Sequence, residues 1–497
     1  MNQRFQQNNA FFDVVIIGGG INGACLYHHL CAAGYKVLLV EKGDFASGTS
    51  QATAMMAWGG LLYLKNFDLL TVRKLCRARD KLVQDMPSFV QPQRFRYIPR
   101  RSQALVTTAL YSYWILGGGK TPLPKKEKFY PEWVLLKPEA RKTSFAYQEA
   151  SVIPSDARFV LQWLLAYHND FQKPLNYAEI KTAIFVQASS AWTLEIQDLL
   201  RNQQYPVQAR FIINTAGIWT DRVNDYFARK TPYKHVFSKG VSINFERDKV
   251  QQLPLLLDTR SQGDGMALIP WGPVAVWGST EQTCATIEEG FTLKKEDLTS
   301  LLEEYNAHFQ KAKGVSDIIS FRIGMRPLAV KKSYQKNSHT LELSRRHYLY
   351  FDPEVPWMSV YGGKLTSCVA LAQEITKKIQ QIIPRGKITP QLEEKKLREA
   401  EYISFPGVSQ KFLSPEWCSG YEYCQTFEDY LRRRTNIAQW IEHGGFGKNF
   451  ENLPLMKKIA KVFLKNSEKN TLEDTEKAVE AYRLSVEKNE AIILSSE

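Results

Sequence analysis

The chain has 497 residues, of which 44% are hydrophobic and 12% aromatic, so it is long enough for about three domains and can bury a large core. This composition excludes an intrinsically disordered, a collagen-like or a small disulfide-rich protein. The formal net charge of +14 favours an anionic partner, such as a phosphorylated substrate, an acidic lipid or nucleic acid, although a scattered basic surface gives the same value.

The first predicted elements form a strand–turn–helix–strand unit. Residues 13–17 are an apolar run typical of a buried parallel strand, a helix is expected from the following glycines to about Ala33, and a second strand is expected over residues 36–40. Between strand and helix stand three glycines in G-x-G-x-x-G spacing: Gly18, Gly20 and Gly23. They permit a tight turn, close approach of a pyrophosphate and close helix–strand packing, so the unit predicts a dinucleotide site.

An acidic residue completes this pattern. Glu41 ends the second strand, 18 residues after Gly23, where a carboxylate can accept hydrogen bonds from ribose hydroxyls. Its charge argues against NADP, whose 2′-phosphate it would repel. Glu41 does not distinguish NAD from FAD.

Later elements predict a mixed α/β core followed by a helical region. Short β-like runs alternate with turns over residues 171–214, a polar helix is expected over 294–311, and a strand, Gly362-Gly363 and a helix starting near Leu365 are expected over 357–379. Beyond residue 395, Lys, Glu and Arg dominate, strand patterns vanish, and residues 426–440 and 453–464 have helical periodicity. We therefore expect a separate all-helical C-terminal domain. Within it, Arg432-Arg433-Arg434 is interpreted as a solvated helix face, with a lipid or partner contact as the alternative.

The motifs resemble those of a known family. Residues 44–64, 155–158, 214–219, 324–328 and 361–366 are similar, in this order, to motifs of the FAD-dependent glycerol-3-phosphate dehydrogenases, members of the D-amino-acid oxidase-like flavoprotein superfamily. Residues 426–435 resemble the family's helical C-terminal domain. The resemblance implies FAD as cofactor and a Rossmann-type FAD-binding domain with an α+β substrate (cap) domain.

The resemblance also implies the residues of the FAD site. Gly59-Gly60 and Gly362-Gly363 are expected to lie against the flavin ring, and the helix after Gly363 is expected to direct its N–H groups to the flavin edge that gains negative charge on reduction. The short hydroxyls of Ser47, Thr49 and Ser50 are candidates for the pyrophosphate or ribityl chain. The complete expected set is Gly18, Gly20, Asn22, Gly23, Glu41, Lys42, Thr49, Ser50, Gly59, Gly60, Gly217, Gly362, Gly363, Lys364, Leu365 and Thr366.

Two arginines and a lysine are the implied substrate ligands. By resemblance, Arg326 and Arg345 bind the substrate's phosphate, which suits the fork geometry of arginine, and Lys364 lies near flavin and substrate. Arg326 precedes Pro327 and is expected in a Gly-rich turn. Arg345 adjoins Arg346 and His347, so the alignment there can shift by one residue.

Three positions depart from the family pattern. The usual His-Gly-Gly-Leu-Arg-Tyr run reads Trp-Gly-Gly-Leu-Leu-Tyr over residues 58–63, so that Trp58 and Leu62 replace a histidine and an arginine, and Ser242 stands where a histidine is usual. Oxidation of an alcohol needs a base for the hydroxyl proton, and neither Trp nor Leu can serve. Candidates for handling the proton are Lys364, Tyr63, Lys239 and His235. The alternative is a flavoprotein with lost or altered catalysis.

Residues 102–119 are uncharged, rich in apolar and aromatic side chains, and flanked by basic residues: Arg100, Arg101, Lys120, Lys125, Lys126 and Lys128. This pattern is typical of an interfacial membrane helix, and a buried cap helix is the alternative. The seven cysteines, which include no C-x-x-C pair, and the polar N-terminal residues predict a cytoplasmic location. Bacterial members of the family sit on the inner membrane and pass electrons to quinone. The resemblance therefore implies a peripheral location on the cytoplasmic face of that membrane.

The sequence thus predicts an oxidoreductase that converts sn-glycerol 3-phosphate, or a related phosphorylated alcohol, to the ketone by hydride transfer to FAD. Lys364, Arg326 and Tyr63 are the expected catalytic residues, and Arg326, Arg345, Lys364 and Ser242 the expected substrate ligands. An amine or amino-acid oxidase on the same fold stays open, as does a homodimer; no metal and no nucleic acid are expected. The expected domains are FAD-binding (1–80, 150–225 and 335–385), substrate or cap (81–149 and 226–334) and helical C-terminal (395–497).

Overall fold

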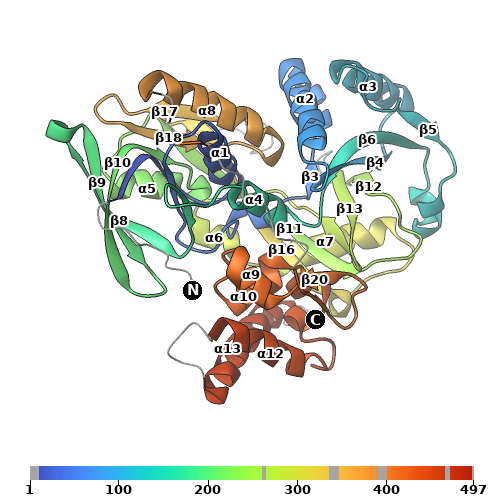
Figure 1. Cartoon of the computed structure of the whole chain (residues 1–497). Helices are drawn as coiled ribbons and strands as arrows, with labels where there is room; N and C mark the ends of the chain where they lie inside the picture. Colours follow the sequence, from blue (N-terminus) through green and yellow to red (C-terminus); the bar gives the residue numbers. More distant parts are fainter. Residues whose placement is uncertain are drawn as a thin grey trace.

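Two large β-sheets stand side by side above a cluster of C-terminal helices in the computed structural model (Figure 1). The structure describes residues 10–259, 265–334, 346–384, 386, 388–389, 400–464 and 471–494. Within these residues, no helix has both the length and the apolar character needed to cross a membrane. All seven cysteines are buried, unpaired thiols.

The first sheet is built around parallel strands. Its order is β17-β18-β10-β1-β2-β7, with β1 paired in parallel to both β2 and β10. The antiparallel strands β8 and β9 extend it from β10, and β17 runs antiparallel to β18. The strands are β1 (Ala10–Ile17), β2 (Val37–Val40), β7 (Gln172–Leu175), β8 (Ala178–Val186), β9 (Ala191–Asp198), β10 (Gln203–Asn214), β17 (Tyr348–Phe351) and β18 (Trp357–Tyr361).

Helices cover one face of this sheet. In β1, Val14 and Ile16 pack into a core with α1 (Ile21–Ala32), α4 (Asp156–Leu165) and α8 (Cys368–Ile382). Val15 faces the opposite side, into a core with the β8–β9 hairpin. Because both faces are buried, β1 reads as an unbroken apolar run rather than an alternating one. The structure thus confirms the predicted Rossmann-type unit.

The second sheet is mostly antiparallel, in the order β15-β11-β14-β13-β12-β4-β6-β3, with β16 added to β11 and β5 to β6. Its strands are β3 (Met56–Ala57), β4 (Val90–Ile98), β5 (Lys125–Glu127), β6 (Ser144–Val152), β11 (Tyr233–Glu246), β12 (Leu255–Asp258), β13 (Gly265–Trp271), β14 (Val274–Gly278), β15 (Gln282–Cys284) and β16 (Ser320–Lys331). The helices connected with it are α2 (Leu69–Asp85), α3 (Gln103–Leu116), α6 (Ile287–Phe291) and α7 (Lys295–His308), while α5 (Thr220–Tyr226) follows β10. Division of the chain at the domain boundaries given above stays a prediction.

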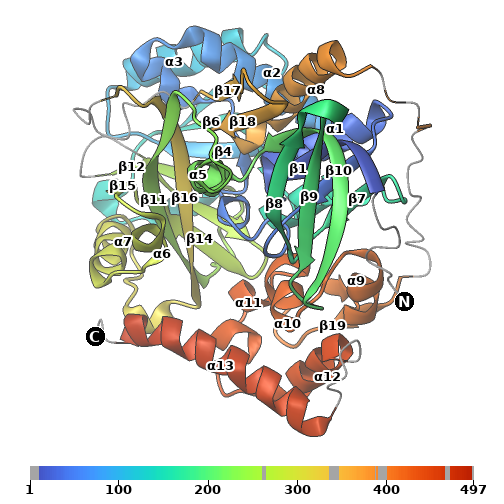
Figure 2. The same ribbon diagram turned by 90° about the vertical axis from the view of Figure 1, so that its left-hand side faces the viewer.

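The C-terminal region lies beneath both sheets (Figure 2). It contains α9 (Pro415–Tyr421), α10 (Phe427–Asp429), a π-helical turn (Tyr430–Arg434), α11 (Ile437–Trp440), α12 (Leu453–Leu464) and α13 (Leu472–Leu494). The predicted helix over 453–464 is confirmed, whereas the one over 426–440 is divided into three short pieces. A two-stranded ribbon, β19 (Tyr402–Ser404) with β20 (Lys411–Leu413), was not expected from the sequence.

The prediction that residues 432–434 form a solvated helix face is wrong. Arg433 and Arg434 are each only 4% exposed, and both bond to acidic residues. The helix α3, which lies within residues 102–119, is buried on one side only, and contact of its other side with a membrane stays a prediction. Val106 and Leu110 are buried, while Leu105 and Ile115 on the other side are 60% and 65% exposed.

Candidate functional site: a dinucleotide cavity with a cationic end

The turn between β1 and α1 requires its glycines. Gly18 has φ of +103°, and a Cβ at Gly23 would lie 1.9 Å from the carbonyl oxygen of Gly18. Any side chain at Gly23 would therefore force backbone atoms apart. The first turn of α1 is thus held close to β1, with the helix N-terminus at the cavity, as a dinucleotide site requires.

Glu41 lies beside this turn at the end of β2. Its Oε2 accepts from the Gly19 N–H at 2.7 Å and its Oε1 from the Gly43 N–H at 2.8 Å. Burial raises the pKa of Glu41, and these N–H bonds only partly offset that effect. Lys42 points instead to the surface, where its Nζ pairs with Glu179 at 2.6 Å. Glu41 therefore shapes the turn as well as lining the cavity.

The residues after β2 bring two hydroxyls to the cavity. Ser50 Oγ accepts from the Ile21 N–H at the start of α1, at 3.0 Å. Thr49 donates its hydroxyl to the Met325 carbonyl at 2.6 Å and so joins this loop to β16. Ser47, Thr49 and Ser50 all line the cavity, and the hydroxyls of Thr49 and Ser50 already make these hydrogen bonds within the protein.

The Gly362–Gly363 turn follows β18 and is held from both sides. Asn22 Nδ2 donates to the Gly362 carbonyl at 3.0 Å, and the Gly362 N–H donates to His235 Nε2 at 3.2 Å. A Cβ at Gly363 would lie 2.8 Å from the Asn22 amide. A side chain at this position would thus collide with Asn22, and the expected contact of the turn with the flavin ring stays a prediction. Asn22 Oδ1 is buried and has no hydrogen-bond partner.

Gly59 and Gly60 are also packed closely by protein atoms. A Cβ at Gly59 would lie 2.0 Å from the Tyr113 hydroxyl, and Gly59 is absent from the cavity lining. Gly60, with φ of +85°, lines the cavity and packs against Tyr63. Close protein packing accounts for the absence of a side chain at both glycines, and their expected contact with the flavin ring stays a prediction.

A buried network behind Gly59 was missed from the sequence. Glu149 accepts from the Gly59 N–H at 3.0 Å, from Arg79 at 2.9 Å and from the Tyr113 hydroxyl at 2.5 Å. Burial raises the pKa of Glu149, with Arg79 as the main opposing influence. Because these residues stand on α2, α3 and β6, no local sequence signal connects them.

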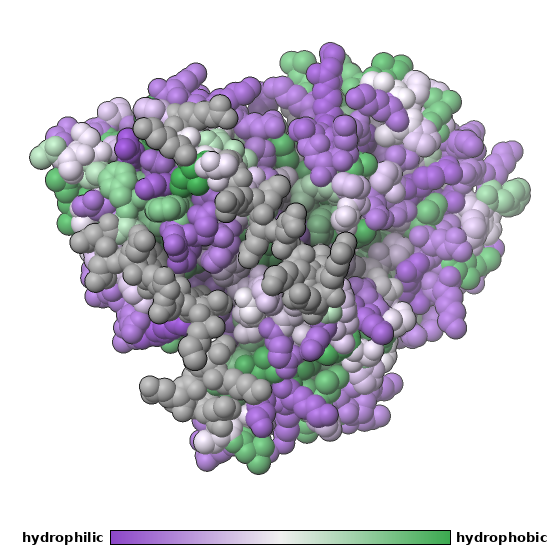
Figure 3. All heavy atoms as spheres, in the orientation of Figure 1, coloured by the Kyte–Doolittle hydropathy of each residue, from purple (hydrophilic) through white to green (hydrophobic). Residues whose placement is uncertain are grey.

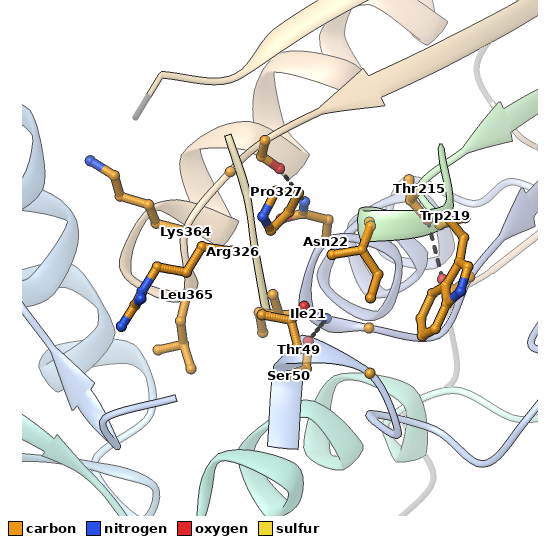
Figure 4. A pocket seen from close by; sticks show the side chains of 18 of the residues that line it. Ile21, Asn22, Thr49, Ser50, Thr215, Trp219, Arg326, Pro327, Lys364 and Leu365 are labelled. Carbon is orange, nitrogen blue, oxygen red and sulfur yellow. Dashed lines mark hydrogen bonds between the residues drawn. The ribbon is translucent and has the colours of Figure 1, made fainter. Parts of the chain in front are cut away.

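These elements enclose a cavity of about 810 Å³ between the two sheets. Trp219 lies at one end of it, and Arg326 and Lys364, which extend toward the same side, lie at the other (Figure 4). Glu41 and Gly217 also line it. Of the expected cofactor set, all but Gly23 and Gly59 line it: Gly18, Gly20, Asn22, Glu41, Lys42, Thr49, Ser50, Gly60, Gly217, Gly362, Gly363, Lys364, Leu365 and Thr366.

Arg326 lies in strand β16, opposite Ser238 of β11, and not in the expected turn. Its Nη2 lies 2.8 Å from Ser279 Oγ and its Nη1 3.4 Å from Ser238 Oγ. Glu281 Oε2 lies 3.9 Å from Nη1. The guanidinium is thus surrounded by two hydroxyls and one carboxylate, and 29% of the side chain remains exposed.

Lys364 and Tyr63 meet at the same end of the cavity. Lys364 Nζ lies 4.2 Å from the centroid of the Tyr63 ring, a cation–π geometry. Trp58 also lines this end. Arg345 lies outside the described residues; its neighbour Arg346 lines the cavity and pairs with Asp68 at 3.5 Å.

Other expected residues lie elsewhere. Ser242 and Leu62 are not among the lining residues. Lys239 is buried and pairs with Asp297 of α7, so it is wrong as a candidate for handling the proton. His235 is fully buried behind Gly362, with Nδ1 3.5 Å from Asp221, which makes it a support for the turn.

Comparison with known proteins identifies the family to which the chain belongs. The profile of the family described as FAD dependent oxidoreductase matches residues 13–376. The chain belongs to this family. As an FAD-dependent oxidoreductase, it uses FAD as its cofactor, and the glycine turn and Glu41 that line the cavity fit that dinucleotide.

This FAD-dependent oxidoreductase is 28% identical over 377 residues to the aerobic glycerol-3-phosphate dehydrogenase of Escherichia coli K12, with 74% of this chain and 73% of the relative covered. It is 27% identical over 379 residues to the glycerol-3-phosphate dehydrogenase of Pseudomonas aeruginosa, covering 74% and 72%.

Two solved structures share the fold. The glycerol-3-phosphate dehydrogenase of Bacillus halodurans, complexed with FAD, covers 97% of this chain and 95% of its own, at a TM-score of 0.67 and 18% identity. The glycine oxidase of Geobacillus kaustophilus covers 75% and 95%, at a TM-score of 0.53 and 14% identity.

Proposed function

We propose that this oxidoreductase converts a small phosphorylated secondary alcohol, sn-glycerol 3-phosphate in the first instance, to the corresponding ketone. The observation that carries this proposal is the cationic end of the cavity, where Arg326 and Lys364 extend toward the same side. A phosphate dianion suits a planar guanidinium, and this one is held in place by donating to the hydroxyl oxygens of Ser238 and Ser279. The names of the curated relatives support the same substrate.

The cofactor site proposed here follows the cavity from Glu41 to Lys364. Glu41 would bind the ribose, the α1 N-terminus with Ser50 would bind the pyrophosphate, and the Gly362–Gly363 turn would meet the flavin. When bound there, FAD would supply the acceptor for one hydride, which carries both electrons of the oxidation. The buried and unpartnered Asn22 Oδ1 leaves one acceptor available at this turn.

In the proposed mechanism, Arg326 fixes the phosphate and Lys364 stabilises the substrate oxygen as its proton departs. An ammonium next to a hydroxyl favours the alkoxide, which lowers the barrier to loss of hydride from the same carbon. Tyr63 holds the ammonium through its ring and carries a hydroxyl that can relay the proton to solvent. Trp58 excludes water from this end without taking part in proton transfer.

Anaerobic mixing tests the proposal directly. The FAD-loaded protein should lose its visible flavin absorbance on addition of sn-glycerol 3-phosphate, and glycerol, which lacks the phosphate, should have little effect. Bleaching by glycine or L-proline but not by the phosphorylated alcohol would contradict the proposal. If none of these compounds bleaches the flavin, the protein binds FAD without this turnover.

Oxidation of an amino acid is the second candidate, and one observation favours it. Glu281 lies 3.9 Å from Arg326 and partly neutralises the guanidinium. A carboxylate with one negative charge needs less positive charge than a phosphate dianion. The amine arm of the same experiment therefore tests this candidate.

We further propose that electrons pass to a quinone at an anionic membrane. The apolar face, formed by the exposed side chains of Phe67, Leu70, Leu105, Ile115 and Phe129, surrounds α2 and α3. Hydrophobic atoms appear over α3 at the upper right of Figure 3. Exposed basic residues accompany the apolar face: Arg73, Lys74, Arg77, Lys120, Lys125, Lys126 and Lys128.

Vesicle co-sedimentation tests this contact. The protein should bind vesicles of phosphatidylglycerol but not of phosphatidylcholine, and Ile115→Glu should abolish binding. Leu472→Glu, at an exposed position on α13, is the matched control and should leave it unchanged. Equal binding by Ile115→Glu and the unmodified protein would argue against the apolar face.

A further inference from the structure

Three consecutive arginines of the C-terminal region reach the loop that follows β2. Arg434 holds the Asp44 carboxylate with two bonds, Nη1 to Oδ2 at 2.6 Å and Nη2 to Oδ1 at 2.9 Å. Arg433 Nε donates to the same Oδ2 at 2.5 Å. The side chains of Asp44 and Arg434 are fully buried. We call this arrangement the Asp44 clamp.

The clamped loop, residues 44–53, is also a wall of the FAD cavity. Ser47, Gly48, Thr49 and Ser50 line the cavity, and Ser50 bonds to the first turn of α1. Inside the loop, Gln51 Nε2 donates to the Ser47 carbonyl at 2.5 Å. One face of the loop therefore meets the cofactor site while the other meets the C-terminal region.

Further arginine contacts fix the far end of the loop. The Gln51 carbonyl accepts from Arg322 at 2.9 Å and from Arg432 at 3.4 Å. Arg322 also pairs with Asp156 at 2.7 Å, and Asp156 accepts from the Thr53 N–H at 2.8 Å. The loop is thus held at its beginning by the Asp44 clamp and at its end by Arg322 and Arg432.

A buried carboxylate is costly unless it is paired. Without the C-terminal arginines, Asp44 would keep only its bond from Asn176 Nδ2, at 2.9 Å, and would have to reach water. Reaching water requires the loop to move, and movement displaces Ser47 and Ser50 from the cavity. The docked C-terminal region therefore stabilises the loop in the conformation that lines the cavity.

We propose that the C-terminal region (residues 400–464 and 471–494) completes the FAD site through the Asp44 clamp, so that its docking and FAD binding are coupled. By linkage, each event strengthens the other by the same factor. The coupling goes beyond the oxidation proposed above, because it involves no substrate, and its tests use none.

The first test compares the full-length protein with and without FAD. Limited proteolysis should release the C-terminal region at least tenfold faster from the deflavinated protein than from the FAD-loaded protein. Equal cleavage rates would overturn the proposal. This measurement needs no variant.

The second test uses Asp44→Asn, which keeps the size of the side chain and removes its charge. We expect the FAD dissociation constant, measured by quenching of flavin fluorescence, to rise at least tenfold, and the protection by FAD to be lost. A dissociation constant within twofold of the unmodified protein would overturn the proposal. If this variant does not fold, Arg434→Lys, which keeps a charge but not the paired bonds, should show the same change in smaller measure.

Glu422→Gln is the matched control. The Glu422 side chain pairs with Arg158 of α4 at the same interface, and the Glu422 carbonyl, which accepts from Arg434 Nε at 2.9 Å, is left in place by the substitution. We expect faster cleavage both with and without FAD, with the ratio between the two rates and the FAD affinity unchanged. Loss of FAD protection in this variant would show that docking in general, and not the Asp44 clamp, provides the coupling, and would overturn the assignment.

Discussion

The ammonium of Lys364 lies over the ring of Tyr63, 4.2 Å from its centroid, at the cationic end of the cavity. Lys364 follows β18 of the first sheet, and Tyr63 follows β3 of the second sheet. This contact therefore depends on the assembled fold. It combines a charge and a polarizable ring at the place where the proposed substrate loses its proton.

Substitutions of Lys364 and Tyr63 should distinguish the effect of the charge on the reaction from the effect of the ring. We expect Lys364→Met to slow flavin reduction by the substrate about 10- to 100-fold, the effect of losing one charge-assisted contact. Tyr63→Leu should have a smaller effect in the same direction, and Tyr63→Phe should retain the ring effect while shifting the pH profile if the hydroxyl relays the proton. Stopped-flow absorbance measures all three. Lys457→Met, at an exposed ion pair on α12, is the control.

Gly240→Ala should move Arg326 without unfolding the protein. A Cβ at Gly240 would lie 2.8 Å from Nη2 of Arg326, the flexible end of that side chain. We expect the KM for the phosphorylated alcohol to rise about tenfold, in line with about 1.4 kcal/mol of weakened binding, and the thermal midpoint to stay nearly unchanged. An unaltered KM with an intact fold would remove Arg326 from the substrate site.

Gly23→Ala should act on the backbone and not on a side chain. Its Cβ would lie 1.9 Å from the Gly18 carbonyl oxygen, which cannot move without distorting the turn. We expect purified protein without FAD and with a lowered thermal midpoint. Gly420→Ala, with nothing within 4 Å of the added Cβ, is the control and should bind FAD normally.

Lys239→Met distinguishes a structural lysine from a catalytic one. Removing Lys239 leaves the Asp297 carboxylate buried and unpaired, which costs about 3–5 kcal/mol of stability. Denaturant unfolding should show this loss. The rate of flavin reduction per folded, FAD-loaded molecule should stay unchanged; a large decrease would return Lys239 to the proton pathway.

The Asp44 clamp predicts a contribution to stability that acid removes. Burial alone would raise the pKa of Asp44, but Arg434 and Arg433 outweigh it and hold the pKa at about 2. Because the folded-state pKa is below the unfolded value of about 3.9, the contribution is complete above pH of about 4 and is lost as the pH falls toward about 2. Asp44→Asn should lack this acid-dependent part of the unfolding profile, measured by circular dichroism.

The glycine turn and Glu41 could be predicted from sequence because each belongs to a local pattern of about 30 residues that fixes its own geometry. Arg326 was identified as important but placed in a turn, since the pairing of β16 with β11 is a long-range property. The roles of Lys239 and Arg434 could not be predicted at all. Their acidic partners, Asp297 and Asp44, are 58 and 390 positions away, and nothing near either residue indicates which carboxylate it meets.

The central position of β1 in its sheet has a consequence for biosynthesis. Residues 10–17 are synthesised long before their partner β10 ends at Asn214 and before β18 ends at Tyr361, and Arg434 follows later still. The nascent chain therefore carries unpaired apolar strands for most of its synthesis, the state in which chaperones engage a polypeptide. The Asp44 clamp can form only after Arg434 has been synthesised, and in cells short of the flavin nucleotide we expect the C-terminal region to be cleaved sooner than in cells that are rich in it.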